Sequence, residues 1–137
     1  MSGHDAVRKA QVVRANLEKL QRIPQGSYEE FASDFRNTEA SLHLLQTAIQ
    51  ALLDLAGGIC ARLGLDTPGT SFEVLERLEA DGRLPAGSAK RFAPILGFRN
   101  RVVHLYDRID PEIVYRVVRE RRGDLLTLLE LLLAIDA

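Results

Sequence analysis

The residue types best suited to chemistry gather in one ten-residue stretch, Gly97-Phe98-Arg99-Asn100-Arg101-Val102-Val103-His104-Leu105-Tyr106. The guanidinium of Arg99 is permanently charged and can bind a phosphate through two parallel hydrogen bonds. His104 has an unperturbed pKa near ~6.5, so it can act as a base or an acid near neutral pH. Cleavage of RNA needs a base for the 2′-hydroxyl proton, an acid for the departing 5′-oxygen and positive charge beside the phosphate. The residue types in this stretch are therefore compatible with cleavage of a phosphodiester bond, which we take as a hypothesis.

The spacing of these residues permits a shared site but does not force one. On an ideal helix, Asn100 and His104 lie within about 40° of each other, whereas Arg99 lies about 140° from His104. The long side chain of Arg99 could still reach the same ligand if a cleft lies at the helix end. A histidine beside an arginine and a tyrosine near a helix end is also common in purely structural settings, so that alternative stays open.

The stretch holds one histidine, which is little for chemistry that needs both an acid and a base. A two-fold dimer would bring two copies of His104 into one cleft, which is a mechanistic reason to expect a homodimer. The sequence offers no obvious metal site, because the acidic residues are scattered and the three histidines lie far apart. We therefore expect no metal and no cofactor.

Apolar spacing and capping signals predict the elements that position this stretch. Asp110 followed by Pro111 is a strong start signal for the last helix. Pro94 lies inside the preceding helix and predicts a kink or a restart near Ala93. No strand alternation appears, so the sequence predicts an all-α, up-down bundle of four or five main helices in a single domain, 1–137. The predicted helices are 6–23, 28–34, 38–63, 72–80 with Ser71 as cap, 86 or 88 to 105, and 112–135.

The segment 38–63 has an apolar stripe too wide for a helix that packs on one side only, which predicts the central helix. Its polar interruptions are His43, Gln50 and Asp54. Gly57 and Gly58 each cost about 1 kcal/mol relative to alanine inside a helix, and we interpret them as a close backbone approach by a neighbour or a bend.

The last helix ends in an apolar run with more leucines than one face of a monomer covers, so part of it is expected to bury against a second subunit. A fully enclosed final helix is the alternative. The leucines concerned are Leu125, Leu126, Leu128, Leu129, Leu131, Leu132 and Leu133.

Composition limits the remaining classes. With 46% hydrophobic and 27% charged residues, the 137-residue chain has the composition of a globular protein rather than a disordered one. The single cysteine, Cys60, excludes a disulfide framework, fits the reducing cytoplasm and is interpreted as a buried hydrophobe. No run approaches the roughly 18–20 apolar residues of a membrane span. The net charge of −1 gives no field that would attract nucleic acid. Of the 18 basic residues, 15 are arginine, and either phosphate binding or a coding bias could explain this excess.

Several other residues have less specific interpretations. His43 is expected at a core or surface position, and Tyr28 and Tyr115 are expected to pack. A basic cluster near the start of the last helix is either a solvated face or a binding surface for RNA or an acidic partner. Its members are Arg116, Arg119, Arg121 and Arg122.

The stretch 97–106 resembles, position for position, the Arg-x4-His-x-Tyr block of HepT-like proteins, a branch of the HEPN superfamily of small all-helical ribonuclease toxins. Similar segments at 65–78 and 109–115 extend the resemblance over nearly the whole chain. The resemblance implies a homodimeric, metal-independent endoribonuclease in which Arg99 binds phosphate, His104 transfers protons and Asn100 orients or polarises. It also implies a minimal nucleotidyltransferase (MNT) antitoxin as partner, which neutralises the toxin by transferring AMP to Tyr106. The alternative is a non-catalytic nucleotide-binding or scaffold subunit of the nucleotidyltransferase complex, in which Arg99 and His104 hold nucleotide phosphates.

Overall fold

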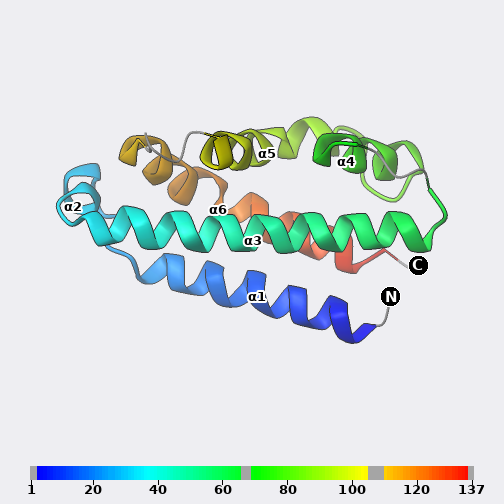
Figure 1. Cartoon of the computed structure of the whole chain (residues 1–137), viewed down its shortest axis with the longest axis horizontal. Coiled ribbons are helices and arrows are strands. Elements are labelled where there is room, and N and C mark those ends of the chain that lie inside the picture. Colours follow the sequence, from blue (N-terminus) through cyan, green and yellow to red (C-terminus); the bar gives the residue numbers. More distant parts are fainter. Residues whose placement is uncertain (1–2, 66–68, 105–109, 136–137) are drawn as a thin grey trace.

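Six helices and no strand make up the part of the chain that the computed structural model describes, residues 3–65, 69–104 and 110–135 (Figure 1). The predicted all-α fold is therefore confirmed. The helices are α1 (Gly3–Arg22), α2 (Tyr28–Ala32), α3 (Phe35–Arg62), α4 (Ser71–Ala80), α5 (Ser88–His104) and α6 (Pro111–Leu133).

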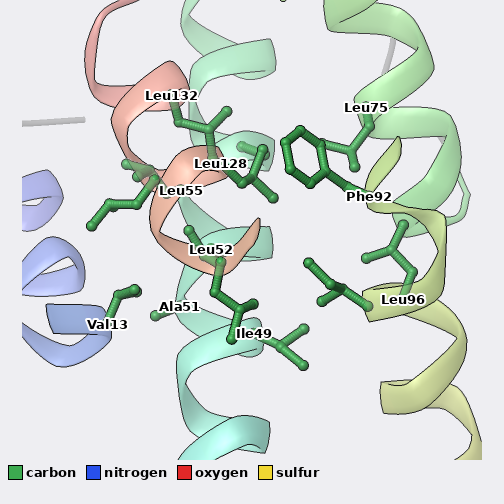
Figure 2. Packing of buried hydrophobic residues seen from close by; sticks show 14 of the residues in the cluster. Val13, Ile49, Ala51, Leu52, Leu55, Leu75, Phe92, Leu96, Leu128 and Leu132 are labelled. Carbon is green, nitrogen blue, oxygen red and sulfur yellow. The ribbon is translucent and has the colours of Figure 1, made fainter. Parts of the chain in front are cut away.

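The centre of the fold is α3, which contacts every other helix. Figure 2 shows its buried side chains, such as Leu52 and Leu55, among those of the surrounding helices, including Val13, Phe92 and Leu128. By length and composition alone α3 could cross a membrane, but 61% of its most apolar window is buried inside the protein, as in the core helix of a soluble bundle. The predicted central helix is thus confirmed.

Short polar side chains fix where most helices begin. Asp110 caps α6 as predicted, and Ser27 caps α2; in both, a side-chain oxygen accepts from an amide of the first helical turn. Helices α1, α3 and α4 begin earlier than predicted, and the first of them, α1, begins at Gly3 rather than at residue 6. Asp34 caps α3, which therefore begins at Phe35 rather than at residue 38. Thr70, not Ser71, caps α4, since the Thr70 hydroxyl accepts from the Glu73 amide.

Helix α5 is continuous, so a restart near Ala93 does not occur. Pro94 and Lys90 are both exposed, so the Lys90 carbonyl that lacks its usual helical donor lies on the water side of the helix. On the opposite side, the buried Phe92 and Ile95 hold both halves of α5 against the core. This burial explains why an interior proline does not interrupt the helix.

The monomer covers most of the leucines of α6, so the run itself is weak evidence for a second subunit. Leu125, Leu128, Leu129 and Leu132 are at most 1% exposed because α6 packs against both α1 and α3. Leu131 packs partly against the same core, and only Leu126 and Leu133 among these leucines are each 39% exposed.

The glycines of α3 do not end it, in agreement with the sequence interpretation, because the helix continues to Arg62. Of the two alternatives for these glycines, a close backbone approach by a neighbour is wrong at Gly57. A β-carbon added at that position would meet nothing within 4 Å. An alanine would therefore fit at Gly57 without displacing a neighbour.

Candidate active site

The candidate site lies in the C-terminal part of α5 and begins at Arg99, directly after the buried Phe98. Phe98 is 4% exposed and packs into the core, whereas Arg99 is half-buried and Asn100 and Arg101 are exposed. Since each residue turns an α-helix by about 100°, burial of Phe98 determines which way the next three side chains project. The core thus orients the polar residues of the motif.

Arg99 is held by a side chain of α3. Its Nε and Nη2 atoms both donate to Oε1 of Gln50, over 3.1 and 2.7 Å. Gln50 in turn donates from Nε2 to Oδ1 of Asp54, one helical turn further along α3, over 2.8 Å. These three side chains form a polar row on the outside of the bundle, which we call the Arg99–Gln50–Asp54 row.

The direction of the helices determines what lies next to this row. Figure 1 shows α5 running antiparallel to α3, so that its C-terminal end lies over the first half of α3. His43 is exposed and precedes Gln50 by seven residues, which places it on nearly the same face of α3 about 10 Å along the axis. The polar face of α3 therefore continues towards the end of α5.

Asn100 and His104 both lie within α5, so their four-residue spacing is one uninterrupted helical turn, as the sequence interpretation requires. Asn100 has no hydrogen bond to the Arg99–Gln50–Asp54 row. The side chain of His104 and the whole of Tyr106 lie outside the described residues. Their convergence with Arg99 stays a prediction.

Asp110 and Pro111 fix the start of α6, the helix that follows α5 in the chain. Asp110 accepts from the Glu112 amide over 2.9 Å, with Pro111 as first helical residue. Further along α6, the ring of Tyr115 packs against Tyr28 and Phe31, with centroids 5.6 and 5.3 Å away. The packing role predicted for both tyrosines is confirmed.

Two comparisons of sequence address the family. The family model of HepT-like ribonucleases matches residues 13–132. The chain is 31% identical to the tRNA nuclease HepT of Aphanizomenon flos-aquae over 110 residues, which are 80% of this chain and 75% of that protein. The chain belongs to the HepT-like ribonuclease family.

More distant members of the HepT-like family agree. The mRNA nuclease HepT of Shewanella oneidensis is 23% identical over 118 residues, covering 86% of this chain and 88% of that one. A solved structure of a tri-AMPylated Shewanella oneidensis HEPN toxin in complex with MNT antitoxin superposes with a TM-score of 0.84 at 22% identity, over 98% and 99% of the two chains. This superposition shows that the fold is that of HEPN toxins.

The other candidate residues of this HepT-like chain have ordinary surroundings. His43 lies on the surface, within the range that was predicted. Cys60 is 3% exposed with Sγ 3.9 Å from the Val74 carbonyl, and burial raises the pKa of its thiol. Such a thiol is poorly nucleophilic, which confirms its interpretation as a buried hydrophobe.

Three arginines of the basic cluster on α6 have partners within the described structure. Arg116 pairs with Glu112, and Arg121 pairs with Asp124. Arg119 donates to the Gln25 carbonyl over 2.6 Å and to the Tyr115 hydroxyl over 3.1 Å. These partners within the chain favour a solvated helix face over a binding surface for RNA or an acidic partner.

Sequence reasoning missed the partners of Arg99. Gln50 and Asp54 were noted only as polar interruptions of an apolar helix. The available signal was that both polar residues lie one turn apart on the same face of α3. Pairing them with Arg99 required the relative placement of α3 and α5, which single-helix periodicity does not contain.

Proposed function

We propose that this chain is the ribonuclease toxin of a HEPN/MNT toxin–antitoxin pair, acting in the cytoplasm as a metal-independent endoribonuclease. The proposal is supported by membership of the HepT-like family and by two relatives described as a tRNA nuclease and an mRNA nuclease. The single observation in the structure that supports it is Arg99, held at the surface with its charge not cancelled by any ion pair within the described residues.

In this mechanism Arg99 binds a phosphate of the RNA and stabilises the charge that develops on it. His104 removes the proton of the attacking 2′-hydroxyl or donates one to the departing 5′-oxygen. Asn100, one turn before His104, orients or polarises the reacting groups. Two chains supply both proton-transfer roles if they form a homodimer in which the two copies of the motif share one cleft.

The proposed control is AMP transfer to Tyr106 by an MNT antitoxin. A relative of the same fold is described as a tri-AMPylated HEPN toxin in complex with MNT antitoxin. Added phosphates two residues from His104 would repel RNA and fill the cleft.

The decisive experiment compares wild type with His104→Ala on labelled RNA. Loss of the histidine should reduce cleavage by about 100-fold or more, because proton transfer contributes at least that much. Dimerisation and binding of the antitoxin should persist. Cleavage at the wild-type rate by His104→Ala would contradict the catalytic role of this histidine. No cleavage of RNA by the wild type itself would favour the nucleotide-binding subunit.

A second experiment addresses the control. Incubation with the nucleotidyltransferase and ATP should add AMP units to the wild-type chain, seen as mass increments. Tyr106→Phe should accept none, and continued modification of that variant would exclude Tyr106 as the acceptor.

A further inference from the structure

The guanidinium of Arg99 offers two edges, each able to donate two parallel hydrogen bonds, one through Nε and Nη2 and one through Nη1 and Nη2. Gln50 occupies the first edge, with both donors directed at the single oxygen Oε1. The outer edge has no protein partner among the described residues. Within the described part of the chain, the contact therefore orients the guanidinium and leaves its outer edge for a ligand.

The acceptor on Gln50 is neutral, and this has consequences for the charge. A carboxylate at the same place would hold Arg99 as well, but it would also cancel the charge that a phosphate requires. Asp54 supplies the carboxylate of the row, and this carboxylate accepts a hydrogen bond from the amide of Gln50 instead of from the guanidinium. The arginine is thus fixed in place while it keeps its positive charge.

Asp54 also determines which way the amide of Gln50 faces. Its Oδ1 accepts from Nε2 of Gln50, so the carbonyl end of the amide is directed towards Arg99. With the amide reversed, two sets of N–H donors would face each other and Asp54 would face a carbonyl oxygen. The carboxylate therefore fixes the amide in the orientation that accepts from arginine.

From this row we infer that Gln50 is a positioning residue for Arg99, holding the guanidinium so that its outer edge binds an RNA phosphate, with Asp54 fixing Gln50. The inference rests on the proposed function. An exposed arginine on its own samples many rotamers, and the contact removes that freedom before the ligand binds. The role of Gln50 is therefore exerted through Arg99 and not through direct contact with RNA.

The test is a double-mutant cycle with Gln50→Leu, Arg99→Ala and the double variant. Each is measured for kcat/KM on labelled RNA, for Kd with a 2′-O-methyl RNA that lacks the attacking hydroxyl, and for thermal stability. Gln50→Leu should lower kcat/KM by about tenfold without changing the melting temperature. In the Arg99→Ala background the same substitution should have no further effect. Additive effects, or wild-type kinetics in Gln50→Leu, would overturn the inference.

Two comparisons make the result specific. Asp54→Asn keeps an oxygen for the amide of Gln50 and should retain more activity than Asp54→Ala. The matched control is Gln11→Leu on α1, an exposed glutamine on a helix that does not contact α5, which should behave as wild type.

Failure of the proposed function has a different signature. If wild-type protein does not cleave RNA, the proposed function is wrong, and the cycle is then evaluated from the Kd for 2′-O-methyl RNA. Weaker binding by Gln50→Leu only when Arg99 is present would still support positioning. Equal Kd values in all four proteins, including no binding by any, would overturn it.

Discussion

The two parts of α5 are held in different ways. In the N-terminal part, Phe92, Ile95 and Leu96 are at most 5% exposed, and the helix start is bonded to a carboxylate of α4. In the C-terminal part, Phe98 is the one buried side chain among the described residues, and the half-buried Arg99 is bonded to one exposed side chain of α3. The first part sets the position and rotation of the helix, and the second part uses that rotation. Stability and chemistry should therefore respond to different substitutions on the same helix.

The largest effect is expected from Phe92→Ala in the packed part. Phe92 is fully buried, so its truncation leaves a cavity and should lower the free energy of unfolding by about 3–5 kcal/mol. Denaturant titration followed by circular dichroism measures this. Phe35→Ala is the matched control, because Phe35 is 70% exposed and its truncation should change stability by about 0.5 kcal/mol. An equal loss of unfolding free energy in both variants would contradict the stabilising role of the packed part of α5.

The next effect separates activity from stability. Arg99→Lys keeps the charge but loses the planar fork, so cleavage of RNA should fall by about tenfold to a hundredfold. The melting temperature should not change, because the lost contacts are exposed. The control is Arg22→Lys at the exposed end of α1, far along the chain from the motif, which should keep full activity. A large drop in melting temperature for Arg99→Lys would contradict the division of α5 into two parts.

A smaller effect is expected at the start of α5 and depends on pH. The Glu79 carboxylate accepts from the amides of Ala89 and Gly87, both over 2.8 Å, and these bonds lower its pKa below the ordinary value of 4.5. A lowered pKa in the folded state means that this stabilisation is complete above the unfolded pKa and is lost as the pH falls through the folded pKa.

We expect Glu79→Gln to have a lower melting temperature than wild type at neutral pH. This difference in melting temperature should become smaller as the pH falls below about 4.5. Thermal unfolding across that range measures both trends. The control is Glu76→Gln, at an exposed position of α4, which should have the melting temperature of wild type throughout. A constant gap at all pH values would exclude the carboxylate bonds as the cause.

The smallest effect on the fold is expected at the two exposed leucines of α6. A double substitution, Leu126→Ser with Leu133→Ser, should change the free energy of unfolding of the monomer by about 0.5 kcal/mol per site, since both side chains are already 39% exposed. If these leucines lie in the proposed homodimer, light scattering should detect a lower mass for the variant at a given concentration. An unchanged mass would place the dimer interface elsewhere.

Much of the fold could be predicted from local signals. The cap at Asp110 and the apolar stripe of α3 are properties of adjacent residues, so the sequence alone determines them. The sequence also shows the apolar run of α6. It does not show that α1 and α3 bury this run, because burial of Leu128 depends on how the three helices pack together. The same reason explains the misinterpretation of Gly57, whose open surroundings are set by helices distant in sequence.

The candidate site was predicted less completely. The chemistry of Arg99 follows from residue type, whereas its partner Gln50 lies 49 residues earlier and could be found only by packing two helices together. Glu79 was missed for the same reason, since it caps a helix other than its own. Local sequence patterns identify functional groups well, and they identify long-range polar partners poorly.

The position of α3 in the middle of the bundle has a consequence for how this family changes over evolutionary time. A helix with neighbours on most sides tolerates few substitutions, and drift should concentrate on the narrow face that it turns outward. Gln50 and Asp54 occupy that outward face. A hydrogen-bonding pair at these two positions would stabilise α3 through its own i,i+4 bond and would also hold the arginine opposite it.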